Sequence, residues 1–232
     1  MHPRLAPFAL AAIAVVSVGL AACSSDSGQA VSFTAKHDNI LYEDAEGSLS
    51  NGAGETIHVG TNGQGQIRRG IIAFDVASNV PPDRSAKIAS VRLTLNLSRE
   101  SGETPESVSL HRVLKIWGEG ASDAEGNEGG GVDATAGDAT WVHASYDGDL
   151  WANPGGDFAS EPSATLSIEG LGQHTWTSQK MVDDVRAWVE NPSTDFGWLI
   201  KGNESSDGTV KRFDSKDNHA QTVRPVLVIE FE

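Results

Sequence analysis

The chain has 232 residues, with 32 acidic side chains against 17 lysines and arginines, a formal net charge of −15, and a single cysteine. Such an acidic balance repels nucleic-acid phosphates and anionic lipid headgroups, so neither is expected as a direct partner. One cysteine excludes an internal disulfide, and roughly 200 residues beyond the amino-terminal segment suffice for one sizeable core. We therefore expect one monomeric domain that folds by packing alone.

The amino-terminal segment has the order of a secretory signal peptide. A short basic start is followed by an almost unbroken apolar run over 5–19, which is too short for a lasting membrane span. The stretch Leu-Ala-Ala-Cys at 20–23 resembles the lipobox of bacterial lipoproteins. The resemblance implies that residues 1–22 are removed and that Cys23 is acylated.

The residues after Cys23 are small and polar, which suits a flexible tether, placed here over 23–34. Several acyl chains bury enough methylene groups to anchor a protein stably, so we expect attachment to a membrane of the cell envelope through lipid alone. In lipoproteins, a serine such as Ser24 usually permits export to the outer membrane, if the organism has one. An ordinary signal peptide with an incidental cysteine is the alternative.

Short runs of alternating apolar and polar residues predict strands in the rest of the chain. In the clearest run, 90–98, Val91, Leu93, Leu95 and Leu97 share one face. Further strands are expected at 39–42, 56–60, 68–76, 107–114, 197–202, 209–215 and 225–232. Glycine-rich turn clusters separate these runs. The pattern is that of an all-β chain.

One segment departs from this alternation. In 181–192, Val182, Val185, Trp188 and Val189 share a helical face, and Asn191-Pro192 ends the helix. Many short strands with one short helix predict a jelly-roll β-sandwich. We expect Trp188 in its core, together with Trp117 and Trp198.

Several segments, in order, resemble those of DNRLRE-domain proteins, a family related to disaggregatase-type and carbohydrate-binding modules. They are HDNILYED, GETIHVG, RRGIIAFDV, IASVRLTLNLS, VSLHRVLKIWGEG, ATW, LWANPGGDF, VRAWVENPSTDFGWLIKG, KRFDSKD and RPVLVIEF. The resemblance covers 35–232, which we take as the domain. It implies a jelly roll without catalytic machinery, in surface or secreted proteins, some of which bind polysaccharide.

No catalytic signature accompanies these segments. The sequence lacks a Gly-x-Ser-x-Gly elbow, a His-Glu-x-x-His pair and a phosphate-binding Gly-x-x-x-x-Gly-Lys run. We therefore expect a non-catalytic protein of the cell envelope that binds polysaccharide. A structural or adhesion module that binds protein is the first alternative, and a small polysaccharide lyase or hydrolase is the second.

Residues 118–165 contain few strand-forming residues, many glycines and several acids, as binding loops or disordered loops do. Aromatic rings stack on the apolar faces of sugars, and this region contains Trp141, Tyr146 and Trp151. We predict that Tyr146 and Trp151, with Trp141, contact carbohydrate. The alternative is a hydrophobic plug that holds the loop on the sandwich.

The same loop carries oxygen-bearing side chains of the kind that calcium prefers. The candidate calcium ligands are Asp123, Glu125, Asn127, Asp147, Asp149 and Asp157. A solvated acidic loop is the alternative, and for Asp157 so is the capping of neighbouring N–H groups.

Arginines are scarce in so acidic a chain. Arg68 and Arg212 are candidates for binding an acidic sugar, because guanidinium groups pair with carboxylates. The alternative is that the arginines at 68, 69 and 212 form ion pairs with Asp75 and Asp214.

Overall fold

The structure is a computed structural model that describes residues 29–102, 104–126 and 128–232. The predicted signal peptide, Cys23 and most of the tether lie outside these residues, as does Asn127. Within the described part of the chain, no helix has both the length and the apolar character needed to cross a bilayer.

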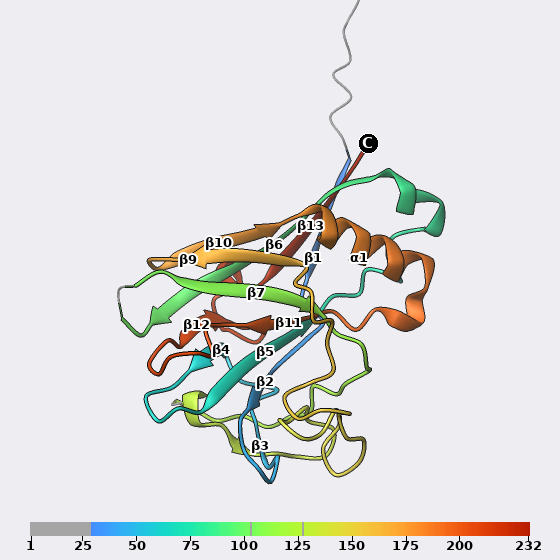
Figure 1. Cartoon of the computed structure of the whole chain (residues 1–232). Coiled ribbons are helices and arrows are strands. Elements are labelled where there is room, and N and C mark those ends of the chain that lie inside the picture. The colour runs from blue at the N-terminus through green and yellow to red at the C-terminus, as the bar shows by residue number, and fades with distance from the viewer. Residues whose placement is uncertain (1–28, 103, 127) are drawn as a thin grey trace, which may run out of the picture.

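The described elements make an all-β sandwich with one α-helix, as the alternation predicted (Figure 1). The strands are β1 Ala30–Thr34, β2 His37–Tyr42, β3 Leu49–Ser50, β4 Thr56–Thr61, β5 Ile67–Ala73, β6 Ile88–Glu100, β7 Glu106–Arg112, β8 Val132–Asp133, β9 Ala164–Ile168, β10 Gly172–Thr177, β11 Trp198–Lys201, β12 Lys211–Asp214 and β13 Val226–Phe231. The helix α1 is Gln179–Glu190, and the short 3-10 helices are η1 Pro82–Lys87, η2 Glu128–Gly130, η3 Pro192–Thr194 and η4 Gln221–Val223.

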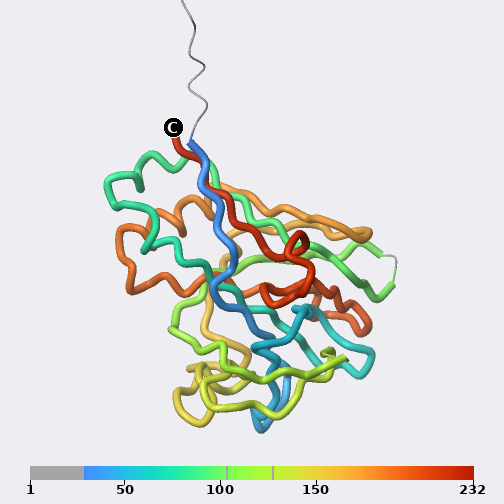
Figure 2. Tube along the Cα trace, turned by 180° about the vertical axis from the view of Figure 1, so that it is seen from behind, coloured from blue at the N-terminus to red at the C-terminus, as the bar shows by residue number. Residues whose placement is uncertain are grey.

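One curled antiparallel sheet forms both layers of the sandwich. In the first layer β6 pairs with β10 along one edge and with β13 and β12 along the other, and β1 pairs with β13. The second layer has the order β2-β5-β11-β7-β9. Strand β4 pairs with both β12 and β5, so it joins the layers. The described chain starts and ends at one pole, and the long loop lies at the other (Figures 1 and 2).

The main core lies between the layers. The four apolar residues of the 90–98 run are at most 1 % exposed, so the predicted inward face of β6 is confirmed. Helix α1 packs its apolar stripe on the same core, and the rings of Trp188 and Trp198 lie 4.6 Å apart. Ser178 caps the helix, because its hydroxyl accepts a hydrogen bond from the Met181 N–H at 3.0 Å.

A second core covers the outer face of the second layer. Leu41, Ile71 and Leu199 point away from the main core and pack with Trp141 and Trp151 of the long loop. Strands β2, β5 and β11 are therefore buried on both faces, which explains why each contains a short stretch of consecutive apolar residues, ILY, IIA and WLI respectively. Trp117 packs on this second core and is partly buried.

Five strands were not predicted, and two of them, β3 and β8, are two-residue strands that pair with each other. Strand β1 lies inside the predicted tether and pairs along its whole length with β13, so the folded domain begins at β1 and not at residue 35. Strands β9 and β10 carry many polar residues, and their pairing with β7 and β6 decides their conformation. Local sequence does not contain that information.

Asp184 ties the helix to the second layer. Its Oδ2 accepts hydrogen bonds from the Trp198 indole N–H at 3.0 Å and from the Ser163 hydroxyl, and its side chain is 4 % exposed. Asp184→Ala should lower the free energy of unfolding by about 2–4 kcal/mol, because two buried donors lose their acceptor. Urea denaturation measures this, with Asp183→Ala, on the exposed side of the helix, as the control that changes stability by less than about 0.5 kcal/mol. Equal losses in both variants would contradict the assignment.

Candidate functional site

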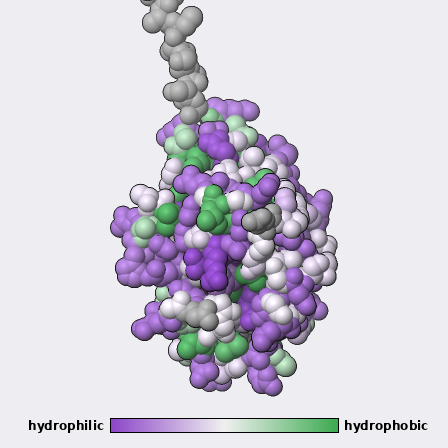
Figure 3. Space-filling view, turned by 90° about the vertical axis from the view of Figure 1, so that its left-hand side faces the viewer, coloured by the Kyte–Doolittle hydropathy of each residue, from purple (hydrophilic) through white to green (hydrophobic). Residues whose placement is uncertain are grey.

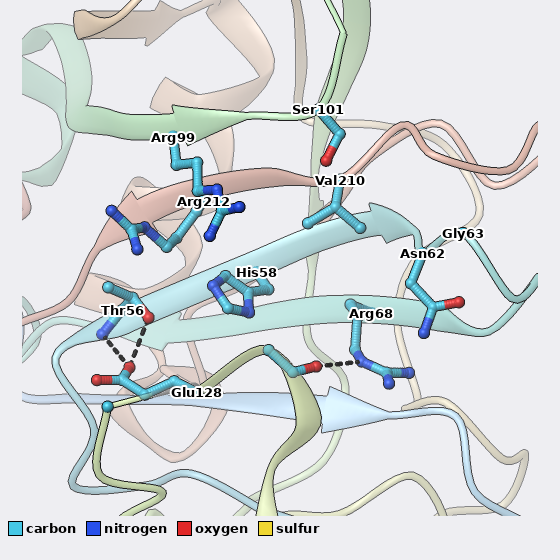
Figure 4. Close-up of a pocket in the computed structure, with 12 residues that line it drawn as sticks. Thr56, His58, Asn62, Gly63, Arg68, Arg99, Ser101, Glu128, Val210 and Arg212 are labelled. Carbon is cyan, nitrogen blue, oxygen red and sulfur yellow. Dashed lines mark hydrogen bonds between the residues drawn. The ribbon is translucent and has the colours of Figure 1, made fainter.

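Three neighbouring strands of the first layer bring three nitrogen-bearing side chains side by side. Arg212 of β12 lies opposite His58 of β4 and opposite Arg99 of β6. Directly opposite residues of antiparallel strands project from the same face of the sheet. An irregularity in the register follows Arg212, and such bulges re-aim side chains. The three side chains gather on one face, as Figure 4 shows.

These side chains line a cavity of about 240 Å³, here called the arginine pocket, together with Thr56, Arg68 and Glu128. The side of the molecule on which β4 and β12 lie is seen face-on in Figure 3, and its darkest, most hydrophilic residues gather near the centre. The strands supply the floor of the pocket. Loop residues 126, 128 and 129 supply one wall.

Glu128 fixes that wall to the sheet. Its carboxylate accepts hydrogen bonds from the Thr56 N–H at 2.7 Å, the Glu55 N–H at 3.1 Å and the Asn51 amide at 3.1 Å. The Thr56 hydroxyl donates to it as well (Figure 4). With these donors the negative charge of Glu128 is already satisfied within the protein. Glu128, the one carboxylate among the described residues that line the pocket, thus serves a structural role.

The Arg68 side chain mainly contacts the loop that forms the wall of the pocket, rather than the open space of the pocket. Its side chain donates to the carbonyls of Gly129 at 3.2 Å and Ile67 at 2.9 Å, and it lies 4.9 Å from the ring centre of Tyr42. The residue is 4 % exposed, so burial lowers its pKa. Of the two arginines predicted to bind an acidic sugar, Arg68 mainly holds the loop in place.

His58 lies at the floor of the arginine pocket and is 7 % exposed. Its Nδ1 is buried and has no hydrogen-bond partner among the described residues. Burial, followed by the positive charges of Arg212, Arg68 and Arg99, lowers the pKa of His58 to about 4. The ring is therefore neutral at pH 7. Its Nδ1 is the nitrogen that no described residue satisfies.

The ion pairs predicted for the arginines are wrong. Asp75 lies 4.0 Å from Lys36, and Arg69 pairs with Glu204 at 2.7 Å. Asp214 accepts hydrogen bonds from the side-chain amides of Asn96 and Asn218. Within the part of the chain that the structure describes, no carboxylate lies within 4.0 Å of the guanidinium of Arg99 or of Arg212. Arg212 donates instead to the Ser98 hydroxyl at 3.1 Å.

The prediction that Trp141 and Trp151 contact carbohydrate is wrong, because both side chains are buried. Trp151 is 5 % exposed, and its indole N–H donates to the Thr140 carbonyl at 2.9 Å. Trp141 is 9 % exposed and lies under the guanidinium of Arg69 at 4.8 Å. Both rings fill the second core, because the outer face of β2, β5 and β11 is apolar. Tyr146 stays partly exposed, with its ring edge on His143.

The structure separates the candidate calcium ligands. Both carboxylate oxygens of Asp157 accept backbone N–H groups, from Ala152 at 2.9 Å and Asn153 at 3.1 Å, which is the capping alternative. Asp147 occupies a turn at a φ of 61°. The backbone carbonyl of Asp149 accepts hydrogen bonds within the same turn.

Asp123 and Glu125 line a different cavity of about 640 Å³, the acidic pocket, with Asp214 and Asp217. The acidic pocket and the arginine pocket share Arg212 and the wall built by Glu128. Calcium binding there stays a prediction.

A further group of carboxylates is an ion-pair network. Oxygens of Asp38, Glu119 and Asp217 lie within 4.8 Å of one another. The Lys216 ammonium lies 3.1 Å from Glu119 and 2.7 Å from Asp217, so a positive charge is already present. Burial raises the pKa of Asp38 to about 8, which keeps this carboxyl protonated at neutral pH.

Arg99 and His58 were not singled out from the sequence. His58 occupies a polar position in a predicted strand, and Arg99 lies one residue beyond the predicted strand 90–98. Their neighbours across the sheet depend on register, which is a long-range property. Arg212 was selected only because cations are rare in this chain. Glu128 was not among the candidate ligands, and the structure uses it to hold the loop on the sheet.

Comparison with known proteins adds no identification. The chain matches no protein-family model. No curated protein matches it either. The resemblance to DNRLRE-domain proteins therefore stays a proposal.

The buried Asp38 predicts a pH dependence of stability. Its pKa is 3.8 in the unfolded chain and about 8 in the folded one, so between these values the folded state binds a proton that the unfolded state releases. The contribution of Asp38 to stability is thus present below pH 4 and lost as the pH rises to 8. Asp38→Asn should make the urea midpoint fall less between pH 5 and pH 8 than in the unmodified chain. Identical slopes for the two proteins would show that Asp38 is ionised in the fold.

Proposed function

We propose that the protein is a cell-envelope lipoprotein whose β-sandwich binds an acidic polysaccharide through carboxylate or sulfate groups at the arginine pocket. The observation that carries this proposal is the row of Arg99, Arg212 and His58 across three strands. Like charges directly opposite each other destabilise a sheet. The chain has 32 acidic residues, yet none pairs with these two guanidinium groups among the described residues. A bound anion would offset the repulsion.

The donor chemistry of the pocket supports an oxyanion as the ligand. A guanidinium group presents a planar fork that matches carboxylate and sulfate oxygens. The neutral ring of His58 and the polar side chains of Thr56 and Asn62 suit the hydroxyl groups of a sugar. The remaining surface is acidic and repels a polyanion, so affinity is expected to depend on these local contacts.

The sequence supports the proposed location in the cell envelope. The lipobox-like stretch that ends in Cys23 implies an anchored protein, and the DNRLRE-like segments imply a module that binds polysaccharide. The described chain starts at the pole opposite the long loop (Figure 1), so a tether attached there would leave the strands that carry the pocket free to face the surroundings. The proposal is binding, without turnover, at this pocket.

Removing either free guanidinium should weaken binding to an acidic polysaccharide. Arg99→Ala and Arg212→Ala should each lower the affinity about tenfold or more, because each deletes a charge-assisted hydrogen-bond donor. Affinity gels or calorimetry with a uronate polymer, a sulfated polymer and a neutral polymer measure this effect. Arg92→Ala is the matched control, because it removes the same charge. Arg92 lies on β6, as Arg99 does, but already pairs with Glu230 at 2.7 Å.

An equal loss of affinity in all three variants would show that binding depends only on the net charge of the protein and not on the arginine pocket. Binding to the neutral polymer alone, unchanged in the two pocket variants, would place the ligand elsewhere.

His58 predicts how binding depends on pH. An anion beside the ring favours its protonated form, so affinity for a sulfated polymer, which keeps its charge in acid, should rise as the pH falls from 7 towards 4. His58→Gln should remove most of this rise and leave binding at pH 7 nearly unchanged. Titrations at several pH values, with salt held constant, measure the difference. A rise of equal size in His58→Gln would assign the effect to other groups.

A further inference from the structure

The outer face of β7 carries a hydroxyl in contact with an imidazole. Ser107, Ser109 and His111 alternate along the strand and point away from the main core. The Oγ of Ser109 lies 2.9 Å from Nε2 of His111, and Nδ1 of His111 lies 2.8 Å from the backbone carbonyl oxygen of Ala159. A nucleophile, a base and a group that orients the base are thus in hydrogen-bond contact.

The contacts determine which nitrogen of His111 carries the proton. A carbonyl oxygen can only accept, so Nδ1 donates to Ala159, and the lone pair of Nε2 faces the Ser109 hydroxyl. Burial, with the nearby charges of Lys201 and Arg69, lowers the pKa of His111, while the Ala159 carbonyl opposes this effect. The ring of Phe158 meets the imidazole edge-on at 5.3 Å and holds its plane. A neutral imidazole with this tautomer is the form that a general base needs.

Ser109 and His111 open onto a cavity of about 420 Å³ between β7 and the chain after β11. Thr165 and Lys201 line the same cavity, and the Lys201 ammonium is held 3.2 Å from Glu204. Besides His111, the Ser109 hydroxyl has one longer acceptor, the Lys201 carbonyl at 3.4 Å. Lys201 lies directly opposite Ser109 on β11. Its positive charge is therefore near the ester oxygen that would become negative when the Ser109 oxygen attacks. The cavity is polar and shallow, which suits a small acyl group.

We propose that Ser109 and His111 form a nucleophile and base that hydrolyse small esters, such as O-acyl groups on carbohydrate. The Ser109 oxygen bonds to the ester carbonyl carbon while its proton passes to Nε2 of His111. The carbon–oxygen bond to the alcohol then breaks, and His111 returns the proton to the leaving oxygen. Water, deprotonated by His111, then bonds to the acyl carbon, the bond to the Ser109 oxygen breaks, and His111 returns the proton to that oxygen. One ester and one water thus give one acid and one alcohol, and both side chains are regenerated.

This inference is independent of the arginine pocket, because the two cavities share no lining residue. It departs from the expectation of a non-catalytic chain. A serine and a histidine two positions apart on a strand form no recognised sequence motif, so only the structure brings the pair to notice.

The test uses the full chain with a fluorophosphonate probe and with p-nitrophenyl acetate. The probe should label Ser109, as located by peptide mass spectrometry, and Ser109→Ala should abolish both labelling and ester turnover. His111→Gln should slow turnover about a hundredfold or more, since it removes the general base. Ser107→Ala is the matched control, because Ser107 lies on the same strand face and in the same cavity and should leave both signals unchanged.

Circular dichroism of each variant separates loss of the fold from loss of chemistry, and Ser109→Ala deletes only one partly exposed hydroxyl. Labelling no faster than that of the heat-unfolded chain would overturn the proposal. Turnover that survives in Ser109→Ala, or equal labelling of Ser107 and Ser109, would overturn it as well.

Discussion

The burial of both faces of β2, β5 and β11 is the constraint on which the rest of the structure depends. One face belongs to the main core, and the other is apolar and would be exposed without the long loop. Trp141 and Trp151 cover it, and burial of a large side chain contributes on the order of 2–3 kcal/mol. A loop that is poor in regular structure is thereby given a fixed place. No disulfide contributes, because the chain has one cysteine.

The position of the loop decides the shape of the arginine pocket. Once the tryptophans are packed, Glu128 reaches the backbone of β4, and Arg68 reaches the carbonyl of Gly129. These contacts join a wall from the loop to a floor from β4, β6 and β12. Acidic and aromatic residues of the loop therefore act mainly as anchors. Among the described residues, Arg99 and Arg212 form no ion pair and Nδ1 of His58 has no hydrogen-bond partner. All three side chains come from strands.

The two proposals occupy different parts of the sandwich and use different chemistry. The arginine pocket gathers two guanidinium groups that pair with no carboxylate among the described residues, which favours binding of an anion. The Ser109 site places a hydroxyl against a neutral base in an open polar cavity, which favours acyl transfer. A protein that binds an acidic glycan and removes ester groups from carbohydrate would use both sites on one class of polymer.

The amino-acid sequence by itself determined the all-β class, the inward face of β6, and the apolar face of the helix and its end at Asn191-Pro192, because alternation and helical periodicity are local. Only the tertiary structure decided that Trp151 is buried and that Arg99 lies beside Arg212. These outcomes depend on which strands pair, in which register, and on what covers the outer face of a sheet. Such contacts join residues far apart in the chain, so no local pattern contains them.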